Sequence, residues 1–320
     1  MAPRYTIIIP VARFEEAGPA LGRLREIAPA AGMQILVALG QHPARQRNAA
    51  LSRSTGEIIV FMDNDSAIGP SYWDELERDF ARAEVEVVGG PALLRPEARG
   101  PERIFHALLT HPLVVGPIRA RYAAIGDFRK TSQTELILCN LSARRPVFEK
   151  IGHLPVELYP NEENEWLDRA QAAGIGIYYD PALQVFRPQR ETWNGMARML
   201  VRYGIGRTKQ LQLSGHFTVH QLAPAALLAP LAALAFGVPG LTLFGFGWLA
   251  VALLVASSIG SRLNSSQRLV AGLVAPFVPL LYAFGQVIGW FRPWPGASAE
   301  VVVVDEKGEA DSPPRGDAAR

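Results

Sequence analysis

The sequence predicts a doubly wound α/β domain followed by C-terminal transmembrane helices. Between residues 5 and 192, strand-like and helix-like segments alternate, which is typical of a largely parallel sheet covered by helices on both faces. Between residues 221 and 292, by contrast, the only charged side chains are Arg262, Arg268 and Arg292. A length of 320 residues is enough for about two domains.

The expected strands are short apolar runs rich in β-branched residues, and the expected helices space their apolar residues three or four apart. The first strand, Tyr5–Pro10, is a run of isoleucines that ends at a proline, as a buried parallel strand does. In chain order we expect strands at 5–10, 34–39, 57–62 and 85–88 and helices at 18–28, 44–52 and 72–83.

Composition excludes several classes of protein. The formal net charge is only +2, so we expect no nucleic-acid partner. The single cysteine, Cys139, cannot form an internal disulfide, which argues against a secreted, disulfide-stapled module.

Three apolar runs occupy residues 222–238, 241–260 and 269–291. A helix needs about 20 apolar residues to cross the hydrocarbon core, so the second and third runs are long enough. The first run is shorter and rich in proline and alanine, so it spans, tilts or lies in the interface. We therefore expect a domain at 1–192, an amphipathic interfacial helix at 193–220, about three transmembrane segments at 221–292 and a disordered tail at 293–320.

The distribution of basic residues predicts the orientation. The N-terminus lacks the long apolar region of a signal peptide. If the first two runs form a hairpin that turns at Pro239-Gly240, the four basic residues that precede the first run lie on the same side of the membrane as Arg262 and Arg268. The positive-inside rule makes that side the cytoplasm and predicts an exported tail. The four are Arg198, Arg202, Arg207 and Lys209.

Asp63 and Asp65 follow the third expected strand in the segment Phe61-Met-Asp63-Asn-Asp65. Two carboxylates that leave the carboxyl end of a buried strand suit Mg²⁺ or Mn²⁺ held jointly with the oxygens of a diphosphate. We expect these two residues to be metal ligands. The alternative is an ordinary turn, since Asp and Asn favour turns for their own backbone hydrogen bonds.

The order of motifs resembles family-2 inverting glycosyltransferases of the GT-A fold, a Rossmann-like mixed sheet. The resemblance covers roughly residues 5–290. It is carried by the run ending at Pro10, by Arg47-Asn48, by the strand leading to Asp63 and Asp65, by Cys139–Gly152, by Tyr159–Arg169, and by Gly174–Tyr179 with Asp180-Pro181. Residues 198–207 are similar to bacterial members, of the succinoglycan type, that build exopolysaccharides and carry C-terminal membrane helices.

This resemblance implies specific roles. Glu163 takes the place of the catalytic base at the start of a helix over 163–172, and Glu162 is the adjacent rival; the alternative is that both are first-turn helix charges. Pro10, Arg47, Asn48 and Asp63 fall on the donor-binding side. Arg187 and Arg190 replace a frequent family histidine and would hold the leaving diphosphate, since arginine binds phosphate oxygens bidentately.

The chain departs from the family where the nucleotide base is usually recognised. Val11-Ala12-Arg13 replaces Tyr-Asn, and the loop at Gly40–Pro43 has no acidic residue. Recognition of the base therefore falls to Gln46, Arg47 and Asn48 or to the main chain, and UDP-sugar and GDP-sugar donors both stay open.

We thus expect an inverting glycosyltransferase of the bacterial inner membrane that faces the cytoplasm. It would move a sugar from a nucleotide-sugar donor to a lipid-linked or polysaccharide acceptor in cell-envelope or exopolysaccharide synthesis, with Mg²⁺ or Mn²⁺ as cofactor. The alternatives are an inactive GT-A-like membrane assembly subunit and a sugar nucleotidyltransferase.

Overall fold

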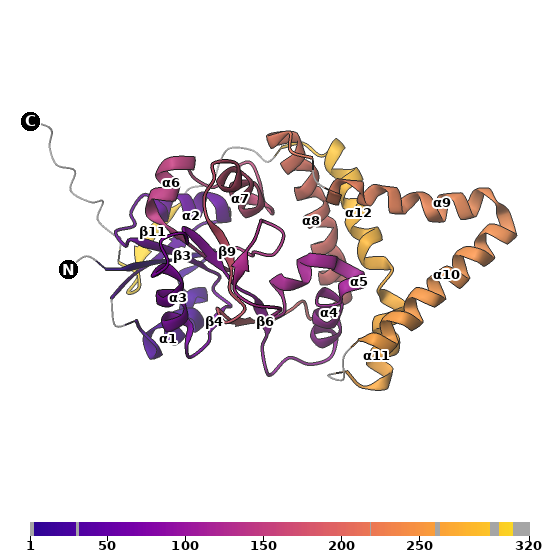
Figure 1. Ribbon diagram of the computed structural model, residues 1–320, viewed down its shortest axis with the longest axis horizontal. Coiled ribbons are helices and arrows are strands. Elements are labelled where there is room, and N and C mark those ends of the chain that lie inside the picture. The colour runs from indigo at the N-terminus through magenta and orange to yellow at the C-terminus, as the bar shows by residue number, and fades with distance from the viewer. Residues whose placement is uncertain (1–2, 30–31, 218, 260–262, 295–300, 310–320) are drawn as a thin grey trace, which may run out of the picture. The chain divides into compact units, whose positions relative to one another are not determined.

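The computed structural model describes residues 3–29, 32–217, 219–259, 263–294 and 301–309. The chain forms two compact units (Figure 1). The first comprises residues 1–93, 124–187 and 296–320, and the second comprises residues 94–123 and 188–295. Residues 94–123, which fall within the domain expected at 1–192, cluster with the helical second unit.

The first unit is built on a mixed sheet of eight strands in the order β11-β2-β1-β3-β8-β5-β9-β7. Its parallel centre consists of β1 (Tyr5–Val11), β2 (Met33–Leu39) and β3 (Ile58–Met62). In this centre Ile7 lies beside Ile35 of β2 and Val60 of β3. The α/β fold expected from the alternating pattern is confirmed. The helices of its first half are α1 (Gly18–Glu26), α2 (Pro43–Leu51) and α3 (Tyr72–Phe80), with a 3₁₀ turn at Phe14–Ala17.

The second half of the sheet makes it mixed. Strand β8 (Asn140–Arg144) lies antiparallel between β3 and β5 (Val87–Gly89). Beyond β5 come β9 (Ile177–Tyr179), which is parallel to it, and β7 (Arg129–Lys130). A separate three-stranded sheet joins β4 (Ala67–Ile68), β10 (Val185–Arg187) and β6 (Ala92–Leu94). Helices α6 (Arg145–Ile151) and α7 (Glu162–Ala172) complete this unit.

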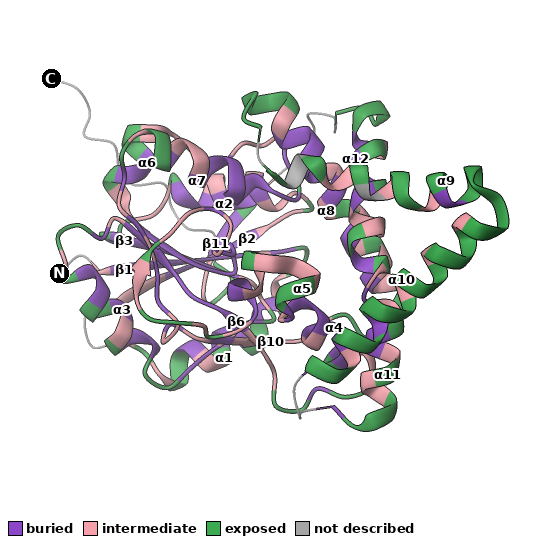
Figure 2. Cartoon of the chain, turned by 45° about the vertical axis from the view of Figure 1, so that its right-hand side comes forward, coloured by how far each residue is buried: buried purple, intermediate pink, exposed green. Residues whose placement is uncertain are grey.

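The core of the first unit is the parallel centre of the sheet, which is buried in Figure 2. Ile7, Ile8 and Ile9 of β1 are fully buried, as are Val60 and Phe61 of β3. Side chains buried on both faces of a strand explain why these segments are continuous apolar runs rather than alternating ones.

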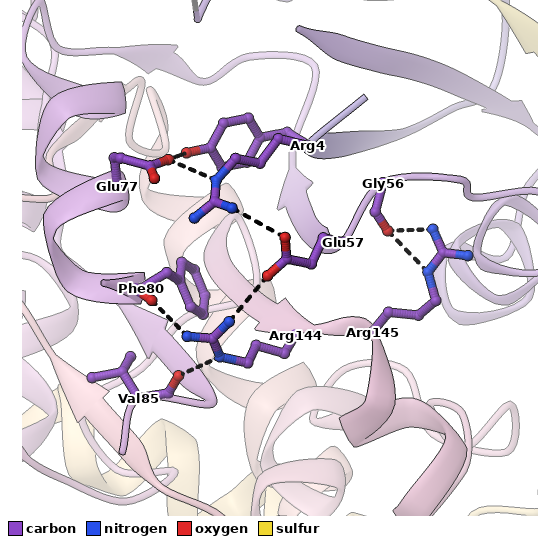
Figure 3. Close-up of polar contacts among 9 residues, drawn as sticks. Arg4, Gly56, Glu57, Glu77, Phe80, Val85, Arg144 and Arg145 are labelled. Atoms are coloured by element: carbon purple, nitrogen blue, oxygen red, sulfur yellow. Dashed lines mark hydrogen bonds and ion pairs between the residues drawn. The ribbon is translucent and has the colours of Figure 1, made fainter. Parts of the chain in front are cut away.

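At the amino-terminal end of these strands, a network of charged residues joins neighbouring chain segments (Figure 3). Arg4 bonds Glu57 at 3.0 Å and Glu77 at 2.7 Å, and Arg144 bonds Glu57 at 3.2 Å. Arg145 donates to the carbonyl oxygen of Gly56. This network fixes the starts of β1 and β3 against the end of β8, at the edge opposite the one that carries Asp63.

The second unit is helical. Its segments are α4 (Pro101–Leu109), α5 (Pro112–Val115), the 3₁₀ helices η2 (Gly116–Arg121) and η3 (Val219–Leu227), α8 (Trp193–Ser214), α9 (Leu228–Ala235), α10 (Gly237–Ser258), α11 (Ser265–Val274) and α12 (Phe277–Phe291). Two stretches of the described residues, 237–258 and 265–291, are long and apolar enough to cross a membrane. The first apolar run, expected to span, tilt or lie in the interface, forms η3 and the eight-residue α9 and is shorter than the other two.

The C-terminal tail differs from expectation. Residues Val302–Asp305 form β11, which pairs antiparallel with β2 at the edge of the main sheet. The predicted disorder is therefore wrong for residues 301–309. The four consecutive valines at 301–304 favour a strand, but the surrounding sequence is rich in acidic residues and proline, which is typical of disorder. Residues 295–300 and 310–320 lie outside the described part of the chain, as does Arg262.

Candidate active site

The site begins with the two carboxylates that follow β3. Strand β10 pairs antiparallel with β4, directly after the acidic segment, with Phe186 opposite Ala67. This pairing brings Arg187 onto both carboxylates: its Nη1 lies 3.0 Å from Oδ2 of Asp63 and its Nη2 lies 3.0 Å from Oδ1 of Asp65. The short pairing of β4 with β10 thus brings Arg187 to Asp63 and Asp65, which lie at least 122 positions earlier in the sequence.

Arg47 of α2 connects this acidic pair to the start of α7. Its Nη2 donates to Oδ1 of Asp63 at 2.7 Å, and its Nη1 donates to Oε1 of Glu162 at 3.2 Å. Burial alone would raise the pKa of Asp63, but Arg187 and Arg47 outweigh it and lower that pKa below its usual value. Asp63 is therefore ionised, and both of its oxygens are engaged by guanidinium groups.

Glu162 and Glu163 are both buried in the first turn of α7, which follows Asn161 in the left-handed conformation (φ 85°). Burial, reinforced by the adjacent Glu163 carboxylate, raises the pKa of Glu162 to about 8, against the opposing effect of Arg47. The partial positive charge of a helix N-terminus favours the ionised form of first-turn carboxylates. Glu162 therefore contacts Arg47, one of the residues expected to bind the donor.

The other predicted donor residues have supporting contacts. Asn48 donates from Nδ2 to the carbonyl of Leu154 at 2.8 Å and accepts from the Leu154 amide at 3.1 Å, so it holds the loop between α6 and α7. Gln46 donates to the carbonyls of Val11 and Ala38, which ties the ends of β1 and β2 together. Its amide nitrogen is thereby used within the protein rather than presented to a nucleotide base.

Pro10 and Arg190 are placed differently from the arginine–carboxylate cluster. Pro10 lies in β1 opposite Ala38 of β2, close to the carboxyl end of the strand. Arg190 is an exposed residue of the second unit, and the cluster in the first unit is built without it. Its contact with a diphosphate stays a prediction.

Cys139 and Asn140 were not expected as site residues, but both are buried and Cys139 lies beside Arg187. Burial raises the pKa of the Cys139 thiol to about 11, and Arg187 lies next to this thiol. Asn140 donates from Nδ2 to the carbonyl of Leu183 at 2.7 Å and to that of Pro91 at 3.2 Å, and its Oδ1 accepts from Tyr72 at 3.1 Å. The sequence signal for such a position is a polar asparagine directly after the apolar run Leu136–Cys139.

The carboxylates suit a divalent cation in their chemistry, because Mg²⁺ is commonly held by one or two carboxylates together with phosphate oxygens. No cluster of three or more potential ligands among His, Cys, Asp and Glu occurs in the described residues. Asp65 is the more available carboxylate, with 37% of its side chain exposed against 26% for Asp63. The donor set therefore fits an ion completed by substrate oxygens, with Asp65 as the more accessible ligand.

Residues 35–152 match the model of the family described as glycosyl transferase family 2. Among solved structures, a mannosyltransferase from Pyrobaculum calidifontis in complex with GDP-Man and Mn²⁺ is similar, with a TM-score of 0.55 and 16% identity. The similarity covers 90% of this chain and 88% of that one. At this identity the likeness establishes the fold.

Two structures of TarS from S. aureus also match. TarS 1–349 has a TM-score of 0.42 at 14% identity, covering 62% of this chain and 65% of that one. Its complex with UDP has a TM-score of 0.41 at 11% identity, covering 96% and 99%. TM-scores this low add nothing to the fold assignment. No curated protein sequence matches the chain significantly. The resemblance to family-2 proteins of the GT-A fold is confirmed, and the succinoglycan branch is not supported.

Proposed function

We propose that this chain, whose residues 35–152 match glycosyl transferase family 2, catalyses an inverting transfer of a sugar from a nucleotide-sugar donor to an acceptor hydroxyl. The observation that carries this proposal is the chain of contacts Asp65–Arg187–Asp63–Arg47–Glu162. It joins the groups suited to a diphosphate to the helix start suited to a base, at the edge of the sheet where α/β proteins bind ligands.

Arg187 is the group best placed to receive the leaving diphosphate. A guanidinium binds phosphate oxygens through two parallel hydrogen bonds, and Arg187 already uses its fork to bridge two carboxylates. Asp65 and Asp63 would hold Mg²⁺ or Mn²⁺, which when bound supplies positive charge to the diphosphate. The similar mannosyltransferase contains GDP-Man and Mn²⁺, which is consistent with such a donor and ion.

Glu163 is the proposed base that removes the proton from the acceptor hydroxyl. Its neighbour Glu162 is hydrogen-bonded to Arg47, and its raised pKa leaves it largely protonated at pH 7. A base must be ionised before the transfer, which disfavours Glu162 for this role. Glu162 is then the positioning residue that keeps Arg47 against the start of α7.

The helices of residues 222–291 support membrane attachment, since helix α10 presents a largely exposed apolar surface (Figure 2). A membrane-held enzyme of this class acts on an acceptor that is itself lipid-linked or on a growing saccharide. We place the chain at the cytoplasmic face of the bacterial inner membrane, where nucleotide sugars are available.

The test is a donor screen on the detergent-solubilised full chain, with UDP- and GDP-linked sugars, a membrane-lipid extract as acceptor and added Mg²⁺ or Mn²⁺. Release of the nucleoside diphosphate is expected with one donor class and should stop in Asp65→Asn. Pyrophosphate release from a sugar phosphate and a nucleoside triphosphate would instead identify a nucleotidyltransferase. Donor binding without turnover would favour an inactive assembly subunit.

A further inference from the structure

We propose that the apolar helices enter the membrane as a hairpin made of residues 222–258, that helices α11 and α12 do not cross it, and that the chain leaves on the side from which it entered. The proposal rests on the membrane attachment argued above. It replaces the three crossings and exported tail expected from the sequence.

Strand β11 lies at the edge of the main sheet of the first unit. It pairs along its whole length with β2, from Val302 opposite Leu39 to Asp305 opposite Leu36. Two arginines of the same unit also hold it: Arg53 donates to the carbonyl of Val303 and Arg25 to that of Glu306, each at 3.0 Å. A strand that belongs to the catalytic sheet lies on the same side of the membrane as that sheet. The number of crossings between Arg187 and Val302 must therefore be even.

The chain on either side of Phe236, the two arms of the hairpin, carries the exposed apolar side chains that would contact lipid. Helix α10 has 22 residues, which corresponds to a length of about 33 Å, enough for the hydrocarbon core. It carries no charged residue, and its Val238, Leu243 and Phe246 side chains are 77%, 74% and 66% exposed. On the preceding arm Leu228, Leu231 and Leu234 are at least 60% exposed. Large exposed side chains on both arms need an apolar partner, and the charge-free α10 is long enough to cross a bilayer.

The two arms turn back on each other at Phe236 and Gly237, between the end of α9 and the start of α10 (Figure 1). Gly240 permits the turn, because a Cβ atom at this position would lie 2.5 Å from the carbonyl oxygen of Ala233. The contact joins the end of α9 to the start of α10. The chain therefore enters and returns through one local hairpin.

Helices α11 and α12 pack against helices that carry charged residues. Helix α12 packs tightly on α8: a Cβ atom at Gly285 would lie 2.2 Å from the carbonyl of Val201, and Thr208 donates to the carbonyl of Gln286 at 2.8 Å. Helix α8 carries the exposed residues Arg198 and Arg202. If α12 crossed the bilayer, this charged helix would be drawn into hydrocarbon, where charged side chains are strongly disfavoured.

Helix α11 has a similar polar neighbour. It contacts α4, which carries the buried Glu102 and the exposed Arg103. The window of highest hydropathy in residues 265–291 is 39% buried within the protein, against 11% for that of α10. This segment is therefore a scaffold against which α4 and α8 pack. Arg268, at the start of α11, is then on the side of the catalytic unit, in agreement with the positive-inside rule.

The test uses three single-cysteine sites in the full chain. The only native cysteine, Cys139, is buried, with 2% of its surface exposed. Labelling of the native chain should therefore be weak, and an introduced cysteine can be detected above it. Ala83→Cys marks the catalytic unit, Ser265→Cys marks the start of α11, and Lys307→Cys marks the turn after β11; all three positions are exposed. A membrane-impermeant maleimide is applied to intact cells that express each variant and again after permeabilisation.

The hairpin predicts that all three sites behave alike, unlabelled in intact cells and labelled after permeabilisation. Labelling of Ser265→Cys alone in intact cells would mean that α10 and α11–α12 are the two crossings, and would overturn the proposal. Labelling of Lys307→Cys but not Ala83→Cys would mean an odd number of crossings, and would overturn it as well.

Two further results separate this proposal from the proposed function. Labelling of all three sites in intact cells would support the hairpin but contradict the cytoplasmic orientation. Recovery of the full chain in the soluble fraction after an alkaline wash of the membranes would contradict both the membrane attachment and the hairpin. It would not bear on the proposed transferase activity, which the donor screen tests separately.

Discussion

At the scale of single residues, the site alternates acidic and basic side chains: Arg187 contacts Asp65 and Asp63, and Arg47 contacts Asp63 and Glu162. The sequence predicted each of these residues from its motif. It could not predict which would pair, because the contacts depend on the register between β4 and β10 and on where α2 presents Arg47.

Arg187→Gln should weaken the binding of a nucleoside diphosphate by about 10- to 150-fold, because charge-assisted hydrogen bonds contribute about 1.5–3 kcal/mol. Isothermal titration with UDP and GDP in the presence of Mn²⁺ measures the loss. Arg78→Gln, which removes a half-exposed arginine paired with Glu75, is the matched control and should bind normally. An equal loss in both variants would assign the effect to net charge rather than to the site.

Glu163→Gln should reduce turnover by about 10²–10⁴-fold with little change in donor affinity, since it removes the base and leaves the arginines in place. Glu162→Gln should lose less at pH 7. Burial and Glu163 raise the pKa of Glu162 to about 8, so the native side chain is mostly protonated there and glutamine resembles it. As pH rises through 8 the native carboxylate ionises, and the difference between Glu162→Gln and the native chain should grow. Collapse in Glu162→Gln with a near-normal rate in Glu163→Gln would exchange their roles.

At the scale of elements, predictability followed the strength of the local pattern. The isoleucine run of β1 and the apolar run of β3 were correctly predicted because strands buried on both faces leave an unbroken signal. Strand β8, with the sequence Asn-Leu-Ser-Ala-Arg, has no such run and owes its conformation to the neighbours β3 and β5. The same holds for β11, whose partner β2 lies more than 260 residues earlier.

Helix packing in the second unit gives a prediction at this scale. Gly285→Ala should destabilise the chain by about 1–3 kcal/mol, because its Cβ atom has no room beside Val201 on α8. Gly245→Ala on α10 is the matched control, since nothing lies within 4 Å of a Cβ atom there. Thermal unfolding in detergent should show a lower Tm for Gly285→Ala only. Equal Tm values would mean that α8 and α12 do not pack at this position.

At the scale of the whole molecule, the C-terminal strand makes the catalytic unit depend on the end of the chain. Val303 and Val304 are buried against the first unit, and each buried valine contributes about 1.5–3 kcal/mol. A chain that ends after Trp294 leaves the edge of β2 unpaired and should lose ~5 °C or more in Tm. A chain that ends after Glu309 retains β11 and should unfold like the full chain. Identical Tm values for the two truncations would show that β11 does not stabilise the sheet.

The most direct test of the whole account is the anomeric configuration of the product formed by the full chain from its active nucleotide-sugar donor. Nuclear magnetic resonance of the isolated glycoside should show a configuration opposite to that of the donor, with one nucleoside diphosphate released for each glycoside formed. Both signals should disappear in Glu163→Gln. A product that retains the donor configuration would contradict direct displacement assisted by a base at the start of α7.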